Sequence, residues 1–409
     1  MKRVVVTGMA SLTAFGNTWK DFNGNLNRGR NATRYMDDWS EIDGLNTKLA
    51  APIPDLTLPS HFTRKKTRSM GRGSIMATIA AEQALKYADL TDSPEITSGA
   101  TGVAFGSCMG STSPIPAYGR LLKDKVMAGV TATSYIQMMG HTTPVNIAVF
   151  LGLKGRVHTT SSACTSGSQG IGYAYEAVRF GKQKIMIAGG AEELCVTQVA
   201  VFDTMYAASM RNDTPETTPR PFDQDREGLV IGEGAGALIL EELEHAQARG
   251  AIILAEVVGY GTNCDGAHIT RPEKDTMRAA MQQALDDAQI SPDAIGYVNA
   301  HGTATEQGDI AETHATREVF QRRIPISSLK SYLGHTLGAC GAIEAWATVN
   351  MMYDNAFAPT LNLQNLDPRC ADLDYITGAF RNLDTEYVMS NNFAFGGINT
   401  SLIFRKWPK

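Results

Sequence analysis

The sequence is poor in cysteine and has no paired cysteine motif. Its six cysteines lie at positions 108, 164, 195, 264, 340 and 370, and no two of them form a CxxC motif. Their neighbours are apolar or glycine-rich, which is typical of free thiols in a reducing compartment and argues against a disulfide framework or a zinc site. We therefore expect a cytoplasmic protein without a metal centre.

The sequence also lacks long apolar runs and an excess of positive charge. No segment has the roughly 18 uninterrupted apolar residues of a membrane span, and the apolar run after Arg3 is too short for a signal peptide. The net charge of −5 argues against general binding to nucleic acids or to an anionic membrane. The glycine-rich run at 232–236 does not follow the strand–GxGxxG–helix pattern, so we expect no nucleotide cofactor.

A pattern repeats within the 409 residues, a length that exceeds the usual size of one hydrophobic core. Gln-Ala-Leu at 83–85 with Ala88 corresponds to Gln-Ala-Leu at 283–285 with Ala288, so the same pattern recurs 200 positions later. Each segment is typical of a helix, and a predicted strand follows it, at 101–105 and at 295–300. The repeat predicts two copies of one α/β unit, each covering the sheet of the other.

Cys164 lies at a predicted helix start. Polar, β-prone residues lead into it from position 157, and a helical face of Ile171, Ala174 and Val178 follows, ending at Gly181. A cysteine there is next to unpaired backbone N–H groups and the positive end of the helix dipole, which favours the nucleophilic thiolate. The alternative is an ordinary buried small residue.

Three further stretches place polar groups where strands end, the usual position of sites in α/β sheets. They lie at 299–305 (Asn-Ala-His-Gly-Thr-Ala-Thr), 330–338 (Lys-Ser-Tyr-Leu-Gly-His-Thr-Leu-Gly) and 390–399. A single histidine is more often structural than catalytic. Two histidines beside glycine, His301 and His335, together with Lys330, favour a catalytic site.

Together these motifs resemble the elongating β-ketoacyl-[acyl-carrier-protein] synthases of the thiolase superfamily. The matching motifs are VTGM at 6–9, SAC at 162–164, RPFD at 220–223, GEGAG at 232–236, HGT at 301–303, GH at 334–335 and FGG at 395–397. The resemblance implies an α/β, thiolase-like fold whose duplicated halves form α-β-α-β-α layers. Residues 1–250 would carry the nucleophilic cysteine, and residues 251–409 the two catalytic histidines.

The resemblance also implies a decarboxylating condensation that needs no cofactor. Cys164 would take an acyl group from a carrier-bound thioester. His301 and His335 would hold malonyl carrier protein and stabilise the enolate left by carbon dioxide, which then attacks the acyl group to give a β-ketoacyl product. The N–H groups of Cys164 and Phe395 would form an oxyanion hole, and Lys330 and Glu312 a buried charged pair, either catalytic or merely structural.

Further residues correspond to binding positions in the family. Thr270, Thr303 and Thr305 would bind the phosphopantetheine arm, and Cys108, with residues 135–139, would line the acyl tunnel. Asn299, Glu344, Asn391 and Asn392 resemble a cluster that surrounds a monovalent cation in some relatives, with a water-filled network as the alternative. Alanines 304 and 394 replace glycines common in the family. The tunnel stretches at 107–109 and 135–139 are also less typical of it, which leaves the substrate open between fatty acyl and polyketide-like or aryl polyene chains.

The expected partner is an acidic acyl carrier protein. The basic residues Arg64, Lys65, Lys66 and Arg68 match a region that docks it, although a solvated helix face explains them equally; Arg120, Lys123 and Lys125 would extend the patch. A homodimer is expected, and a heterodimer with a related ketosynthase or chain-length factor stays open. Cys164 argues against a non-catalytic chain-length-factor role, and the second histidine against a degradative thiolase.

Overall fold

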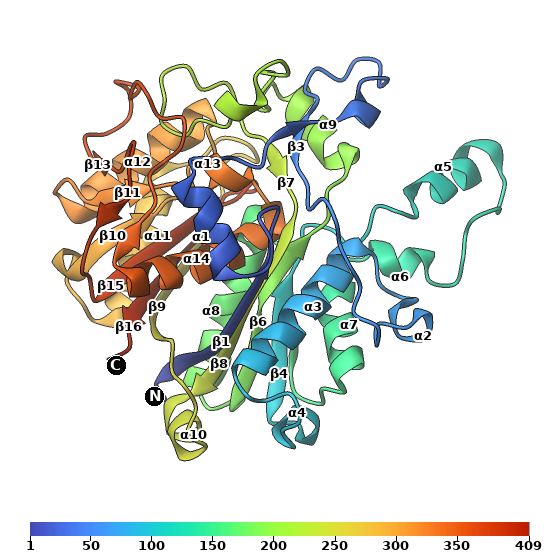
Figure 1. Ribbon diagram of the computed structural model, residues 1–409, viewed down its shortest axis with the longest axis horizontal. Coiled ribbons are helices and arrows are strands. Elements are labelled where there is room, and N and C mark those ends of the chain that lie inside the picture. Colours follow the sequence, from blue (N-terminus) through green and yellow to red (C-terminus); the bar gives the residue numbers. More distant parts are fainter. Residues whose placement is uncertain (409) are drawn as a thin grey trace.

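Two half-sheets with the same internal order meet at strands β1 and β9 in the computed structural model, which describes residues 1–408 (Figure 1). The first half runs outward as β1 (Val4–Leu12), β8 (Gly234–Glu242), β6 (Ile185–Glu192), β4 (Thr101–Gly106) and β5 (Val157–Thr159). The second runs as β9 (Ala255–Cys264), β16 (Ile398–Lys406), β15 (Tyr387–Phe393), β10 (Ile295–Asn299), β11 (Pro325–Ser327) and β13 (Asp374–Tyr375). In both halves the first two pairings are antiparallel and the next two parallel. The duplication predicted from the repeat is confirmed.

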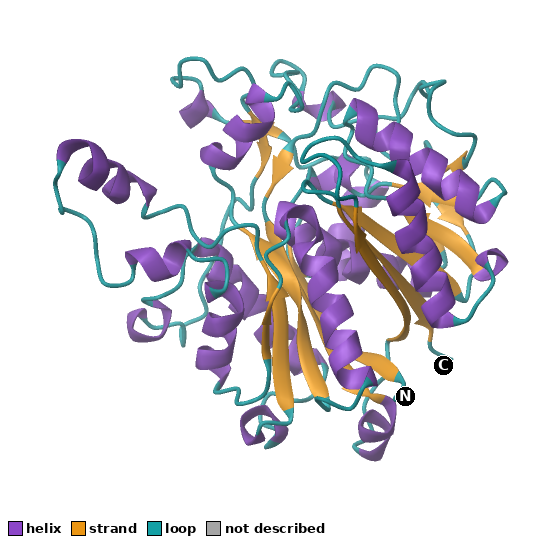
Figure 2. Cartoon of the chain, turned by 180° about the vertical axis from the view of Figure 1, so that it is seen from behind, coloured by secondary structure: helices purple, strands orange, loops and turns teal. Residues whose placement is uncertain are grey.

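Helices cover the outer face of each half-sheet and fill the space between the halves (Figure 2). The long helices are α3 (Arg72–Tyr87), α7 (Thr142–Leu151), α8 (Ser166–Arg179), α11 (Lys274–Ala288), α12 (Glu306–Phe320) and α14 (Cys340–Asp354). Two shorter helices flank the site, α9 (Val196–Thr204) and α13 (Lys330–Leu333). Helices α3 and α7 pack outside the first half and α11 and α12 outside the second, while α8 and α14 contact strands of both. The α-β-α-β-α layering is therefore confirmed.

The remaining elements are short or peripheral. The helices among them are α1 (Trp19–Asn27), α2 (Arg64–Thr67), α4 (Glu95–Ser98), α5 (Ile115–Asp124), α6 (Ser134–Met138) and α10 (Leu243–Ala248). The strands are β2 (Arg34–Tyr35), β3 (Leu49–Ala51), β7 (Ile231–Gly232), β12 (Ala356–Phe357) and β14 (Arg381–Asn382). No helix within residues 1–408 has the length and hydropathy that a membrane span requires.

The sequence repeat has a packing reason. A Cβ on Gly8 would lie 2.2 Å from the carbonyl oxygen of Ala84, and a Cβ on Gly259 would lie 2.2 Å from that of Ala284. Each glycine thus lets a strand of the junction touch the corresponding helix of its half. The matching alanines are conserved between the two copies because any larger side chain would separate helix from sheet.

The two central helices begin in the same way. A short 3₁₀ turn precedes each, Ala163–Thr165 before α8 and Leu337–Ala339 before α14, and its first residue has a positive φ, 51° and 46°. The helices then cross closely, since a Cβ on Gly341 would lie 2.6 Å from the backbone nitrogen of Ser168. Cys164 in the first turn corresponds to Gly338 in the second.

Most of the glycine-rich run at 232–236 lies within the sheet. Strand β8 already begins at Gly234, and a Cβ on Gly236 would lie 2.7 Å from the backbone of Ala342 in α14. The glycines are therefore part of the sheet because α14 packs directly on their backbone.

Helices α5 and α6 form an arm, residues 115–138, that extends from the body of the molecule (Figure 1). Its large apolar side chains have few contacts: Leu122 is 72% exposed, Met127 62% and Tyr135 64%. An apolar surface of this kind is typical of a contact with another chain.

Candidate active site

Cys164 lies in the 3₁₀ turn between β5 and α8, with its side chain buried at the junction of the two halves. The sulfur is 3.0 Å from Nε2 of His335. A ring nitrogen of His301 completes a cluster in which the three ligand-type atoms lie within 4.8 Å of one another. The structure thus brings together the three residues that the resemblance marks as catalytic.

Residues from the first half hold His335 in place. The His335 N–H donates to the carbonyl of Val230 at 2.7 Å, and the Gly232 N–H donates to the carbonyl of His335 at 2.9 Å. Nδ1 of His335 accepts the N–H of Leu337 at 3.2 Å, so the ring proton is on Nε2 and faces the Cys164 sulfur. This tautomer makes His335 a hydrogen-bond donor toward Cys164 and disfavours metal binding through Nε2.

His301 follows β10, and Glu312 of α12 fixes its backbone. The N–H groups of His301 and Gly302 each donate to one oxygen of the Glu312 carboxylate at 2.7 Å. The His301 and His335 rings meet edge-on with centroids 5.2 Å apart, and Nδ1 of His301 is 3.5 Å from the amide nitrogen of Asn392. Glu312 therefore positions His301 through the main chain.

Both histidines are neutral near pH 7. Burial lowers the pKa of His301 and of His335 well below the usual value, and the positive charge of Lys330 lowers it further. A neutral imidazole with its proton on Nε2 can donate to an oxygen that gains negative charge.

The predicted pair of Lys330 with Glu312 is wrong. The buried Lys330 ammonium donates to Glu344 of α14, whereas Glu312 accepts the two backbone N–H groups described above. Burial would lower the pKa of Lys330, but Glu344, with smaller contributions from Cys340 and Glu312, raises the pKa overall. Burial raises the pKa of Glu312 to about 8, although the N–H groups of His301 and Gly302 that donate to the carboxylate lower it.

The thiol of Cys164 also differs from the prediction of a thiolate. Burial raises the pKa of Cys164 to about 11, although Lys330 and the backbone N–H groups of Phe395 and Cys164 lower it. Desolvation of the sulfur outweighs the helix start because burial removes most of the water that would stabilise the thiolate. The N–H groups of Cys164 and Phe395 nevertheless face the sulfur, as an oxyanion hole requires.

The raised pKa predicts the pH dependence of alkylation by iodoacetamide. Because only the thiolate reacts, the rate at Cys164 should rise about tenfold per pH unit from about pH 7 to about pH 9, without a plateau. Peptide mass spectrometry separates this rate from that of the exposed Cys264. A plateau below about pH 8 would show that the helix start prevails over burial.

The loop before β16 lies over the site and contains Ala394, one of the two alanines that replace family glycines. The Phe395 ring stacks on Phe202 of α9 with centroids 5.1 Å apart. Ala394 has no positive φ, so alanine is accommodated there, whereas Ala304 in the loop after His301 has φ 66°. A glycine would relieve backbone strain only at position 304.

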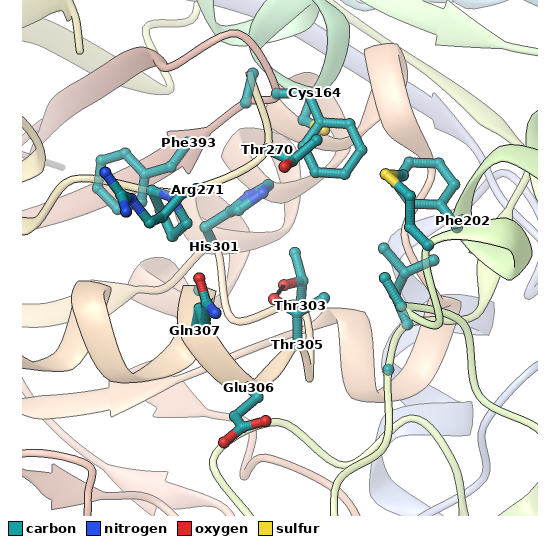
Figure 3. A pocket seen from close by; sticks show the side chains of 18 of the residues that line it. Cys164, Phe202, Thr270, Arg271, His301, Thr303, Thr305, Glu306, Gln307 and Phe393 are labelled. Carbon is teal, nitrogen blue, oxygen red and sulfur yellow. Dashed lines mark hydrogen bonds between the residues drawn. The ribbon is translucent and has the colours of Figure 1, made fainter. Parts of the chain in front are cut away.

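A cavity of about 580 Å³ opens from Cys164 to the surface. Thr270, Thr303 and Thr305 line it together with Cys164 and His301 (Figure 3). Cys108 does not line this cavity; it packs in the cluster that contains Phe202 and Phe395.

The predicted cation cluster is buried, and three of its amide oxygens lack donors within residues 1–408. These are the Oδ1 atoms of Asn299, Asn391 and Asn392, while the Asn392 amide nitrogen donates to Glu344 at 2.8 Å. Buried unpaired oxygens fit ordered water or a monovalent cation.

The docking residues Arg64, Lys65, Lys66 and Arg68 are all exposed on or beside α2, and none forms an ion pair within residues 1–408. Arg120, Lys123 and Lys125 are exposed on the arm.

Phe202 was not predicted from the sequence, because nothing in the pattern of α9 relates it to Phe395.

Comparison with known proteins agrees with this geometry. The sequence matches the family models "Beta-ketoacyl synthase, N-terminal domain" over residues 1–246 and "Beta-ketoacyl synthase, C-terminal domain" over residues 254–364. It is 39% identical to a 3-oxoacyl-[acyl-carrier-protein] synthase 2 of Synechocystis, covering 99% of this chain and 98% of that protein.

Solved structures are similar over the whole chain. A beta-ketoacyl synthase from Burkholderia phymatum has 59% identity and a TM-score of 0.98, with 100% of both chains covered. A type II PKS acyl-carrier protein in complex with its ketosynthase gives 31% identity and a TM-score of 0.88, covering 99% of this chain and 100% of that one. The chain therefore belongs to the β-ketoacyl synthase family.

Proposed function

We propose that the protein is a β-ketoacyl-[acyl-carrier-protein] synthase, an acyltransferase that performs decarboxylative condensation. The observation that carries the proposal is the cluster of Cys164, His301 and His335, with His335 Nε2 3.0 Å from the sulfur. A chain-length-factor role does not need these groups.

The residues divide the reaction between them. Cys164 attacks the thioester of an acyl carrier protein, the carrier thiol leaves, and the backbone N–H groups of Cys164 and Phe395 hold the oxyanion. Malonyl carrier protein then binds with its thioester carbonyl at the two histidines. Carbon dioxide leaves, His301 and His335 stabilise the enolate, and its carbon attacks the acyl group. Cys164 is released as a thiolate.

The direct test is intact-protein mass spectrometry. Mixing the protein with an acyl carrier protein should add one acyl group at Cys164, and malonyl carrier protein should then discharge it as β-ketoacyl carrier protein and carbon dioxide. Absence of the adduct would overturn the proposal. A panel of saturated, conjugated and aromatic acyl groups would distinguish fatty acyl from polyketide-like substrates.

The cavity has the polar groups that a pantetheine arm needs. Hydroxyl groups of Thr303 and Thr305 lie 2.9 Å apart, and the exposed Thr270 stands near the mouth. We assign these three threonines to the arm. The cluster of Asn299, Glu344, Asn391 and Asn392 would hold water or a monovalent cation on the three amide oxygens that lack donors.

The basic residues of α2 are proposed to dock the acidic carrier protein. Reversing the charge of Lys65 and Lys66 to glutamate should raise the carrier-protein KM about tenfold at low ionic strength, with kcat unchanged and a smaller effect in high salt. Steady-state kinetics at two salt concentrations measures this.

Lys86→Glu is the matched control, since Lys86 is exposed at the far end of α3 from α2. It makes the same kind of charge reversal but should leave the KM within about twofold. An unchanged KM in the Lys65 and Lys66 variant would reject this docking site.

We propose a homodimer formed through the edge strand β5 and the α5–α6 arm. Strand β5 ends the sheet, and Val157 on it is 45% exposed, while the arm presents Leu122 and Met127. An unpaired edge beside an exposed apolar surface suits pairing with a second copy. A related ketosynthase or chain-length factor is the alternative partner.

A further inference from the structure

Glu192 is a fully buried carboxylate at the end of β6 with no part in the chemistry described above. One oxygen accepts the N–H groups of Cys108 at 2.8 Å and Gly338 at 3.1 Å. The other accepts the Ser107 hydroxyl and the Gln198 amide, both at 3.2 Å. Four donors thus meet on one side chain.

These donors come from three segments that surround Cys164. Ser107 and Cys108 form the loop after β4, Gln198 belongs to α9, which carries Phe202, and Gly338 lies three residues after His335. Glu192 therefore links the loop of Ser107 and Cys108, helix α9 and the turn that follows His335.

The packing at Gly338 is tight. A Cβ there would lie 2.7 Å from the Glu192 carboxylate and 2.9 Å from the Cys108 nitrogen. The turn between His335 and α14 is pressed against the loop of Cys108, and the carboxylate supplies the acceptor for both N–H groups. Without it, two buried backbone donors would lose their partner.

We propose that Glu192 is a positioning residue of the condensation reaction, which holds the turn after His335 and the Cys108 loop in the arrangement that places His335 against the Cys164 sulfur. This inference rests on the proposed function.

The charge of Glu192 also acts on Cys164. Burial raises the pKa of Glu192 to about 7, so the carboxylate is mostly ionised at pH 8, and its negative charge contributes to the raised pKa of Cys164. Removing the charge should therefore ease formation of the thiolate, while loss of positioning slows condensation. The two effects have opposite signs.

The experiment compares Glu192→Gln with Glu193→Gln. Glutamine keeps the size of the side chain but turns one acceptor oxygen into a donor facing N–H groups. Glu193 is the adjacent buried carboxylate, but it accepts from Thr112 and Ser111 and does not contact Gly338. Both variants replace a buried charge, so a general loss of stability should affect both.

We expect Glu192→Gln to lower kcat by about tenfold or more, with the carrier-protein KM within about twofold, because small displacements at a reacting centre are costly. Alkylation of Cys164 at pH 8 should be faster than in the unaltered protein. Glu193→Gln should keep kcat within about threefold and leave alkylation unchanged. Thermal unfolding of both variants measures the structural loss.

Equal kcat values in Glu192→Gln and the unaltered protein would overturn the inference, as would an equal loss in Glu193→Gln. If the unaltered protein itself forms no β-ketoacyl product, the proposed function fails instead. If Glu192→Gln does not fold, Gln198→Leu takes its place, because it removes only one of the four donors to Glu192. Gln198→Leu should lower kcat without changing the KM. An unchanged kcat in that variant would reject the inference.

Discussion

Replacing Cys164 with alanine is expected to abolish the acyl-enzyme and to lower condensation by about 10⁴-fold or more. No other thiol can substitute, because the sulfur of Cys164 alone lies between His335 and the N–H groups of Cys164 and Phe395. Intact mass and the formation of β-ketoacyl carrier protein measure the two losses.

Cys370→Ala is the matched control. Cys370 is buried in the outer core of the second half, away from the cavity, and its replacement removes the same sulfur from a buried site. It should retain the acyl adduct and most of the activity. Normal product formation by Cys164→Ala would instead support a chain-length-factor role with a separate active partner.

The second large effect is expected at the histidines. His301→Ala or His335→Ala should each slow the release of carbon dioxide from malonyl carrier protein by at least about 100-fold, equivalent to roughly 3 kcal/mol of lost enolate stabilisation. His301→Ala should still accept an acyl group at Cys164, because the histidine in hydrogen-bond contact with the sulfur is His335.

The pH dependence of this step follows from the direction of the pKa shifts. Burial and Lys330 depress the pKa of both histidines, so they remain neutral donors as the pH falls from about 8 to about 6. Carbon dioxide release should therefore show no loss from histidine protonation in that range. A decline with a midpoint near 6.5, the ordinary value of histidine, would contradict the neutral assignment.

His314→Ala is the control for removing an imidazole. His314 is exposed on α12, where Nε2 contacts only the carbonyl of Arg369 at 3.0 Å. Carbon dioxide release should be unchanged. An equal loss in this variant would show that the effects at His301 and His335 come from general destabilisation.

The site could be predicted as far as its residue types and their order. Cys164, His301 and His335 stand beside glycine-containing turns at the ends of strands, and these turns are visible in the chain itself. The duplication was visible too, because Ala84 and Ala284 occupy equivalent helix positions that touch Gly8 and Gly259. A local sequence pattern is enough to predict a residue whose role depends on its neighbours in the chain.

Partners that lie on different helices and strands could not be predicted in this way. Lys330 pairs with Glu344 and not with Glu312, because the direction in which α14 crosses the site decides which carboxylate reaches the ammonium. Glu192 was not recognised, since its donors lie as far as 146 residues from it in the sequence. Such contacts depend on the crossing of central helices, which periodicity does not encode.

The duplicated α/β fold, the nucleophile and the two histidines could all be inferred from the sequence. The protonation state of these side chains could not, because it depends on how the folded chain surrounds them. Cys164 sits at a helix start, which favours a thiolate, but complete burial raises its pKa to about 11. The reason is that residues from both halves of the fold surround the sulfur and exclude water from it. A local sequence pattern around Cys164 does not show these distant neighbours.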